Sequence, residues 1–288
     1  MPILSLTVNN FRNLQDATID VHSKEVFFVG ENGQGKSNLL ESLYYSAYGS
    51  SFRTHTDSQI IKEKEENFSL RSLYTNDKQS TQQINIIFDK NKKIIEKNGK
   101  RIRDRKELIN TIPCVVFCHD DMRFATGEPE FRRFFIDQSL TMYDDLYIDD
   151  LRNYRKILKT RNLLLKEAKY DMLDIYDQQL VQKGLEIQKK RKMAIFQFNE
   201  IFGKLYEQIS GIEGVSIMYL PSWKEIKDEV SKRMPSSEEL LNLLKEKREQ
   251  EKINSTMQVD MLADNLNATS QKAVKQKNSN ISRFVQGG

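Results

Sequence analysis

Residues 30–37 read Gly30-Glu31-Asn32-Gly33-Gln34-Gly35-Lys36-Ser37 and match the phosphate-binding pattern G-x-x-x-x-G-K-[ST]. The glycines of such a loop leave backbone N–H groups free to surround phosphate oxygens. Lys36 is expected to reach the β- and γ-phosphates, and the Ser37 hydroxyl to ligate Mg²⁺. A dinucleotide-binding fingerprint is excluded, because G-x-G-x-x-G needs a glycine where Asn32 stands. The pattern therefore predicts a site for a nucleoside triphosphate and Mg²⁺.

The residues on either side of this loop predict a strand before it and a helix after it. Val26-Phe27-Phe28-Val29 is a short, continuous apolar run, which is typical of a strand buried on both faces. Apolar side chains then recur at helical spacing until Gly49, where the helix is expected to end. The positive end of that helix dipole would point at a bound phosphate.

Periodicity in the first third of the chain predicts further strands. Alternating apolar residues indicate two strands within residues 3–30, and residues 69–74, 83–88 and 93–96 indicate three more. Asn98-Gly99 is a strong signal for a type I′ hairpin turn. Val115-Val116-Phe117 forms a second apolar run that predicts a buried strand.

The rest of the chain has a helical character. From about residue 137 to residue 211 there are few helix breakers, and the apolar positions indicate at least two long antiparallel helices. A coiled-coil dimer is the competing interpretation of this stripe. A polar helix is expected within residues 221–250, starting near Ser236-Ser237-Glu238-Glu239. Residues 254–288 are poor in apolar side chains and are expected to be weakly ordered.

Composition excludes some classes of protein. The chain has 288 residues, of which 38% are hydrophobic and 30% charged, so it is neither a disordered chain nor a membrane protein. Two cysteines and the lack of an export signal predict a cytoplasmic protein. The net charge of +4 permits nucleic-acid binding without demonstrating it.

A P-loop enzyme also needs an acidic residue at the end of a second buried strand. Asp89 follows such a run but lies in the hairpin region, whereas Asp120 follows residues 115–117 at a better distance along the chain. With Asp120 as a metal ligand, the protein would be a compact P-loop kinase or NTPase. Cys114 and Cys118 would lie ~13 Å apart on an extended strand, which is too far for one metal ion.

Several blocks of sequence resemble the RecF family of bacterial recombination and repair ATPases, which is related to SMC and Rad50 proteins. The block at residues 127–137 is the most specific, because it is close to the family signature G-x-P-x-x-R-R-x-F-L-D. Together the blocks cover roughly residues 3–210 in the family's order. They are Asn10-Phe11-Arg12-Asn13, residues 30–48 with Asn38-Leu39-Leu40-Glu41-Ser42, Gly49-Ser50-Ser51-Phe52-Arg53-Thr54 with Asp57 and Ile60-Ile61, Gly127-Glu128-Pro129-Glu130-Phe131-Arg132-Arg133-Phe134-Phe135-Ile136-Asp137, Leu151 to Lys166, and Tyr176-Asp177-Gln178-Gln179-Leu180.

The resemblance implies an α/β P-loop NTPase fold of the ABC-ATPase head type, with an inserted α-helical lobe. On that pattern residues 1–118 form the ATP-binding lobe, residues 119–250 the helical lobe, and residues 251–288 an incomplete return to the first lobe. It also implies a protein of recombinational DNA repair and replication that binds ATP–Mg²⁺, single-stranded DNA and linear duplex DNA. Such proteins act in gap repair, RecA loading and SOS induction, form ATP-dependent homodimers, and have RecR and RecO as partners.

The chain departs from the family pattern at three places. His119-Asp120-Asp121 stands where the family usually has Pro-Glu-Asp, and residues 256–261 do not supply the Gly-Pro-His motif. Residues 282–288 resemble only the beginning of the signature loop, and the Walker B acid that follows it in the family is missing. We therefore expect a truncated or degenerate member that is at most a weak DNA-dependent ATPase. A non-catalytic DNA-binding remnant is a third interpretation.

The remaining site residues have two interpretations each. The resemblance implies that Arg12 and Asn13 contact nucleotide, whereas the residues alone indicate a polar turn; Arg53 approaches a phosphate or forms a structural salt bridge. Arg132 and Arg133 face DNA or pair with acids at the lobe junction. The cluster Lys189, Lys190, Arg191 and Lys192 binds DNA or forms a solvated helix face. We assign no catalytic residue, because no Ser/His/Asp arrangement emerges.

Overall fold

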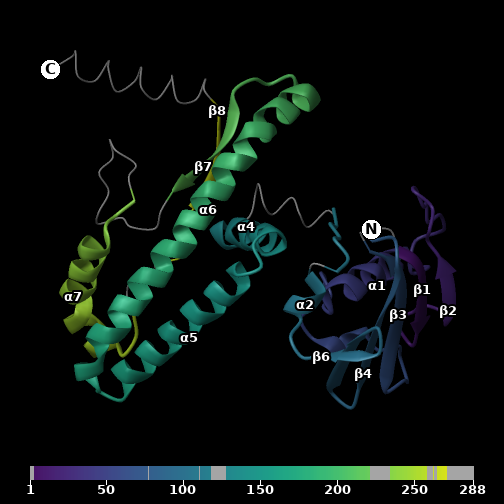
Figure 1. Ribbon diagram of the computed structural model, residues 1–288, viewed down its shortest axis with the longest axis horizontal. Coiled ribbons are helices and arrows are strands. Elements are labelled where there is room, and N and C mark those ends of the chain that lie inside the picture. The colour runs from purple at the N-terminus through teal and green to yellow at the C-terminus, as the bar shows by residue number, and fades with distance from the viewer. Residues whose placement is uncertain are drawn as a thin grey trace. The chain divides into compact units, whose positions relative to one another are not determined.

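The computed structural model describes residues 3–76, 78–109, 111–117, 128–220, 234–257, 262 and 265–270. The chain folds into two compact units, Met1–Phe117 and Cys118–Gly288 (Figure 1). Among the described residues, no helix combines the length and the apolar character needed to cross a membrane.

The first unit is built on a six-stranded antiparallel sheet with the order β2-β1-β3-β4-β5-β6. The predicted strands at residues 69–74, 83–88 and 93–96 are confirmed, and so is the hairpin turn, because Asn98 and Gly99 have φ values of 51° and 74°. The strands are β1 (Ile3–Asn9), β2 (Ala17–Asp20), β3 (Asn67–Thr75), β4 (Thr81–Asp89), β5 (Lys92–Lys97) and β6 (Lys100–Ile102).

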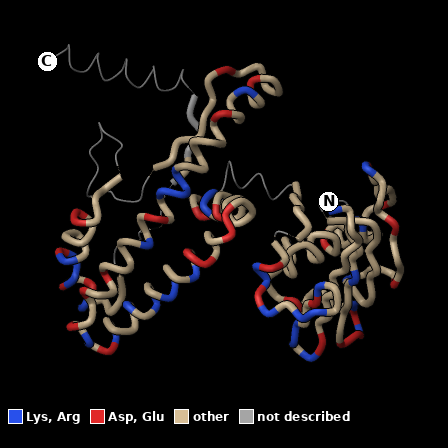
Figure 2. The backbone as a smooth tube through the Cα atoms, viewed as in Figure 1, with Lys and Arg blue, Asp and Glu red and all other residues tan. Residues whose placement is uncertain are grey.

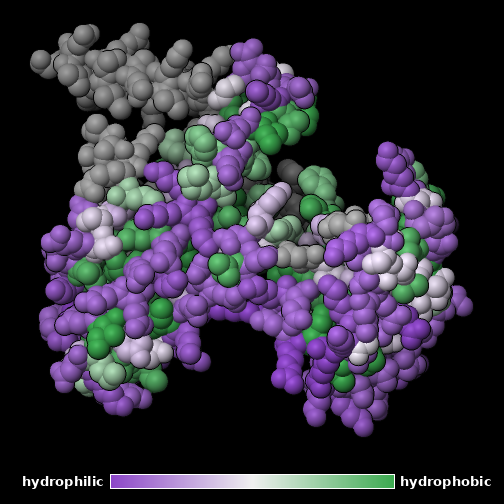
Figure 3. Space-filling model, viewed as in Figure 1, coloured by the Kyte–Doolittle hydropathy of each residue, from purple (hydrophilic) through white to green (hydrophobic). Residues whose placement is uncertain are grey.

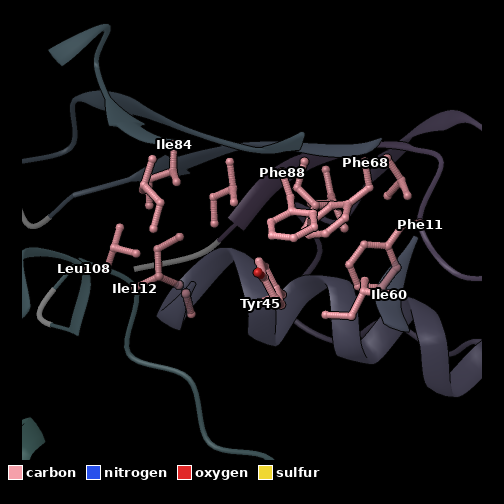
Figure 4. Packing of buried hydrophobic residues seen from close by; sticks show 14 of the residues in the cluster. Phe11, Tyr45, Ile60, Phe68, Ile84, Phe88, Leu108 and Ile112 are labelled. Atoms are coloured by element: carbon pink, nitrogen blue, oxygen red, sulfur yellow. The ribbon is translucent and has the colours of Figure 1, made fainter. Parts of the chain in front are cut away.

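One face of this sheet carries the core of the first unit. Helix α1 (Lys36–Tyr48) lies along that face, together with the short helices η1 (Asp57–Ile60) and α2 (Lys106–Ile109). Tyr45 of α1 packs edge-on against Phe68 of β3, and Phe11 meets both rings, so aromatic side chains join the helix to the sheet (Figure 4). Burying each such side chain stabilises the fold by about 1.5–3 kcal/mol.

Helix α1 ends where the sequence predicts. Gly49 has a φ of 62°, in the left-handed region, and its N–H donates to the carbonyl oxygen of Tyr45 at 2.7 Å. A Cβ at this position would lie 2.9 Å from Cδ1 of Ile95 and 3.2 Å from Cδ1 of Leu108. Glycine is therefore required both by the backbone conformation and by the close approach of β5 and α2.

The two apolar runs that predicted buried strands do not form strands. Phe27 and Val29 are 81% and 93% exposed, and Val115 and Phe117 are 85% and 91% exposed. A strand buried on both faces needs hydrogen-bonded neighbours and covering helices, and neither run pairs with any of the described strands. The prediction was wrong because an apolar run reports the character of the side chains and not whether partners are present.

The second unit is mostly helical. The predicted pair of long helices is confirmed by α5 and α6, which pack side by side and are joined by a short connection (Figure 1). Acidic and basic residues are distributed along both helices (Figure 2). The elements are α4 (Pro129–Tyr143), α5 (Tyr147–Lys166), η3 (Tyr170–Met172), α6 (Leu173–Ser210), β7 (Val215–Leu220), α7 (Ser237–Asn254) and β8 (Asn265–Ser270).

The apolar stripe of α6 is covered by α5 and α7 in its first half and by β7 and β8 around Ile195, whereas its C-terminal end is exposed. Leu180 and Ile187 are fully buried in a cluster shared with α5 and α7. Ile201, Leu205 and Ile209, near the C-terminal end of the helix, are exposed, and hydrophobic surface is visible there (Figure 3). The intrachain packing of α6 on α5 therefore accounts for the first half of the stripe without a coiled-coil partner.

The polar helix expected to start near Ser236 is confirmed by α7. Helix α7 begins with a capping box, in which the Ser236 hydroxyl accepts from the N–H of Glu239 and the Glu239 carboxylate accepts from the N–H of Ser236.

Residues 265–270, which were expected to be weakly ordered, form β8 and pair antiparallel with β7. Composition missed this strand because its pairing partner lies some 50 residues earlier in the chain; residues 271–288 lie outside the described part.

Candidate nucleotide-binding site

The loop of residues 30–35 precedes α1 directly and turns on two glycines. Gly33 and Gly35 have φ values of 86° and 94°, which side chains with a Cβ rarely adopt. A Cβ on Gly35 would also lie 2.8 Å from Cδ2 of Leu14 and 2.9 Å from Oδ1 of Asn13. Gly35 is therefore the position at which only glycine allows the loop to reach the helix.

Lys36, the first residue of α1, folds its side chain back over the loop. Its Nζ donates to the carbonyl oxygens of Gly30 at 2.7 Å and of Glu31 at 2.8 Å. The ammonium group thus lies at the mouth of the loop, where the motif requires a positive charge. Both contacts are to carbonyl oxygens of a solvent-exposed loop, which phosphate oxygens could replace.

The beginning of α1 has the properties of an anion site. Its N-cap residue is Gly35, which has no side chain to cap the helix, and the first helical hydrogen bond runs from the N–H of Leu39 to the carbonyl of Gly35 at 2.9 Å. The N-cap residue therefore offers no side-chain acceptor to the N–H groups of the first turn, and the helix dipole adds a partial positive charge. The Ser37 side chain is exposed at this end. These residues fit a triphosphate with its metal ion.

Asn13 connects the loop to a chain of polar side chains. Its Nδ2 donates to the carbonyl oxygen of Gly33 at 2.9 Å, and its Oδ1 accepts from Nδ2 of Asn38 at 2.7 Å. Arg53 in turn donates from Nη1 to Oδ1 of Asn38 at 2.6 Å. Asn13 therefore holds the middle of the loop, and Asn38 and Arg53 hold Asn13.

Glu41 of α1 is the centre of this network, and its side chain is completely buried. Arg12 binds it in a bidentate manner, with Nε 3.1 Å from Oε2 and Nη2 2.8 Å from Oε1. Arg53 donates to Oε2 at 3.2 Å, which confirms the salt-bridge interpretation of that residue, and the Ser51 hydroxyl donates to Oε1 at 2.5 Å. Arg12 also donates to the carbonyl oxygen of Gln59 at 2.7 Å. A buried carboxylate is tolerable here because it is paired and hydrogen-bonded.

Sequence reasoning did not single out Glu41. The sequence does contain a sign of its role. Glu41 is an acidic residue among apolar positions of a helix, and one arginine lies in the segment on each side of that helix. Arg12 and Asn13, which were expected to contact nucleotide, lie beside the loop and are bonded to Glu41 and Gly33. The Arg12 side chain remains 21% exposed.

The residues predicted to contact DNA lie in the second unit. Lys190 bridges Asp144 at 2.6 Å and Asp150 at 2.8 Å, and Arg191 is buried. Arg191 binds both carboxylate oxygens of Asp137 at 2.9 Å. Lys189 and Lys192, the other members of the cluster, are exposed.

Arg132 and Arg133 are half-buried on α4. The second-strand acids are not brought to the loop: Asp89 ends β4 opposite Lys92, and Asp120 lies outside the described residues, as do Cys118, His119 and Gly127. In the part of the chain that is described, no group of three or more His, Cys, Asp or Glu side chains could hold a metal ion. Cys114 is half-buried, and burial raises the pKa of its thiol.

The loop, the helix that follows it and the sheet under that helix are those of a P-loop ATPase fold, and the family described as AAA ATPase domain matches residues 1–285. The "DNA replication and repair protein RecF" of Treponema pallidum (strain Nichols) is 46% identical over 223 residues, 76% of this chain and 62% of its own length. That of Clostridium botulinum (strain Loch Maree / Type A3) is 35% identical over 256 residues, 87% of this chain and 68% of its own length. The chain belongs to the RecF family.

A solved structure supports the same assignment. The recombination mediator protein RecF with ATP, described as part of the RecFOR pathway, is similar with a TM-score of 0.79 and 28% sequence identity, over 93% of this chain and 73% of that one. This likeness confirms the predicted fold class, an α/β P-loop ATPase with a helical second unit. The chain spans 62% of the length of the Treponema pallidum relative.

Proposed function

We propose that the chain binds ATP with Mg²⁺ at residues 30–37 and serves in recombinational DNA repair and replication in the manner of the RecF family. The observation that carries the nucleotide site is the position of Lys36, whose Nζ lies at the loop mouth beside an uncapped helix N-terminus. Membership of the family supports the repair role, because its relatives are named for DNA replication and repair.

Each part of the loop has a distinct task in this proposal. The backbone N–H groups of the loop and of the first turn of α1 receive the phosphate oxygens. Lys36 exchanges its two carbonyl contacts for the β- and γ-phosphates, and the Ser37 hydroxyl holds Mg²⁺. The bound metal ion neutralises phosphate charge. Asn13 and Arg12 keep the loop in place through Gly33 and Glu41, and a direct contact of either residue with the nucleotide stays a prediction.

DNA and protein partners form the second part of the proposal. Exposed Lys189 and Lys192 on α6, with Arg132 and Arg133 on α4, are the residues of the helical unit that we expect to meet DNA phosphates. RecR- and RecO-like proteins are the expected partners, and the pathway named for the RecF–ATP structure supports this expectation. An ATP-dependent homodimer and a cytoplasmic location complete the proposal.

The nucleotide site is tested by replacing Lys36. We expect Lys36→Ala to weaken ATP–Mg²⁺ binding by roughly 100-fold or more, because two charge-assisted hydrogen bonds to phosphate are lost. Isothermal titration calorimetry measures the affinity, and thermal unfolding shows whether the fold is kept. Lys24→Ala, at an exposed lysine of the same unit, is the matched control. An unchanged ATP affinity in Lys36→Ala would defeat the assignment.

A further inference from the structure

A hollow of about 490 Å³ lies in the first unit at the edge of the sheet where β5 and β6 form a hairpin. None of its lining residues belongs to the loop at residues 30–37. Of the six described residues that line it, four are basic and two are isoleucines that face each other across the hairpin. The lining residues are Lys93, Ile95, Arg101, Ile102, Arg103 and Arg105.

The segment that contains β5 and β6 is strongly basic. Residues 92–106 contain eight basic and two acidic side chains, a net charge of +6, whereas the whole chain has a net charge of +4. Figure 2 shows these lysines and arginines in blue. Arg101, Arg103 and Arg105 form no ion pair with any described residue, although Glu96 stands opposite Arg101 in the strand register. Three guanidinium groups therefore share one hollow without a carboxylate partner in the described part of the chain.

Lys93 differs from the three arginines because its charge is already satisfied. Its Nζ lies 2.7 Å from Oδ2 of Asp57 and donates to the carbonyl oxygen of Gly49 at 2.8 Å. Burial lowers the pKa of Lys93, Asp57 raises it, and the nearby charge of Arg105 lowers it again. Lys93 thus forms the half-buried end of the hollow, and the three arginines are exposed.

The chemistry of the lining selects the ligand. Guanidinium groups bind phosphate oxygens in a bidentate manner, and three unpaired guanidiniums call for a ligand with several negative charges. Among the six lining residues none is aromatic, so there is no ring on which an unpaired base could stack. Phosphate contacts of this kind position a nucleic acid without reading its sequence.

We propose that this hollow binds the phosphodiester backbone of duplex DNA, independently of sequence. The inference rests on the DNA-binding part of the proposed function and extends it to the first unit, on the sheet edge at β6. Arg101, Arg103 and Arg105 make the phosphate contacts, and Ile95 and Ile102 form the apolar floor beneath them.

The test compares two triple variants that remove the same charge. Fluorescence anisotropy of a labelled duplex of mixed sequence gives the affinity as a function of salt. With Arg101→Ala, Arg103→Ala and Arg105→Ala combined, the slope of log affinity against log salt should fall by about 2–3, since each phosphate contact contributes about 0.9. With Lys24→Ala, Arg71→Ala and Lys78→Ala combined, three exposed charges of the same unit are lost and the slope should stay unchanged. ATP affinity and the thermal unfolding midpoint of both variants check the fold.

A third variant separates geometry from charge. With Arg101→Lys, Arg103→Lys and Arg105→Lys combined, the slope should be kept while the affinity falls, because the bidentate contacts are lost. Equal losses in the two alanine variants, or no loss in either, would overturn the proposal. So would a hollow variant that keeps duplex affinity but no longer binds polyglutamate, which would indicate an acidic protein partner. If the unchanged chain binds no duplex DNA at any salt concentration, the DNA part of the proposed function fails as well.

Discussion

Each unit contains a buried network of guanidiniums and carboxylates, and the two networks differ in what they adjoin. In the first unit, Glu41 binds Arg12 and Arg53 and is linked through Asn38 and Asn13 to the phosphate loop. The second network joins α5, α6 and α7 and includes none of the predicted site residues. Similar chemistry thus holds the loop at residues 30–37 in one unit and joins helices in the other.

The second network is the more deeply buried of the two. Arg161 of α5 is completely buried and lies 2.5 Å from Asp177 of α6 and 2.7 Å from Glu251 of α7. Arg248 also contacts Asp177, at 2.6 Å. Arg12 and Arg53, in contrast, keep 21% and 43% of their side chains exposed. Water can therefore reach the arginines of the first network but not Arg161 in the second. Substitution of Arg161 should for this reason cost more stability than substitutions in the first network.

We expect the largest loss of stability from Arg161→Ala. The substitution leaves carboxylates buried without the guanidinium that joins them, which lowers the free energy of unfolding by about 3–5 kcal/mol. Urea unfolding measures this change, while ATP affinity should stay the same. Arg155→Ala, at an exposed arginine of the same helix, should change the free energy by no more than about 0.5 kcal/mol. If Arg161→Ala unfolds at the same urea concentration as the unchanged chain, the network is not what joins these helices.

Glu41→Gln should have a smaller effect on stability and a clear effect on nucleotide binding. The amide keeps the shape of the side chain but removes the charge that Arg12 and Arg53 share, so we expect a loss of about 2 kcal/mol in the free energy of unfolding. ATP affinity should fall several-fold, because the loop loses its support through Asn38 and Asn13. Calorimetry with ATP–Mg²⁺ reads the second effect, and Glu63→Gln, at an exposed position, is the control. Lost stability with unchanged ATP affinity would make Glu41 a packing residue only.

Ser51→Ala should have the smallest effect of the three substitutions. The hydroxyl donates to Glu41 and accepts from the backbone N–H groups of Arg53 and Thr54 at 2.8 and 3.1 Å. Losing it should lower the free energy of unfolding by about 1 kcal/mol. Thermal unfolding beside Ser58→Ala, at an exposed serine, detects the difference. A loss as large as that of Glu41→Gln would mean that the hydroxyl, and not the arginines, holds the carboxylate.

The sequence predicted those parts of the fold that depend on local pattern. The loop at residues 30–37, helix α1 with its end at Gly49, and the hairpin at Asn98-Gly99 all follow from residues close together in the chain. The apolar runs at residues 26–29 and 115–117 wrongly predicted buried strands. A buried strand needs neighbouring strands and covering helices, which come from other parts of the chain.

The parts of the site that were missed depend on residues far apart in sequence. Glu41 meets Arg12 from 29 positions away, and a carboxylate within a helix gives no local sign of that partner. Of the basic cluster at residues 189–192, the sequence could not distinguish Arg191, which binds Asp137, from exposed Lys189 and Lys192. The hollow at β6 is lined by residues close together in sequence and was missed for a different reason, because alternating charged and apolar residues in a hairpin are typical of an ordinary edge strand.

A crystal structure of the chain with Mg²⁺ and a non-hydrolysable ATP analogue tests the nucleotide site most directly. We predict that Nζ of Lys36 leaves the carbonyl oxygens of Gly30 and Glu31, now at 2.7 and 2.8 Å, and binds oxygens of the β- and γ-phosphates. The Ser37 hydroxyl should then ligate the metal ion. A nucleotide bound at another place, with Lys36 still on its own loop, would contradict the account.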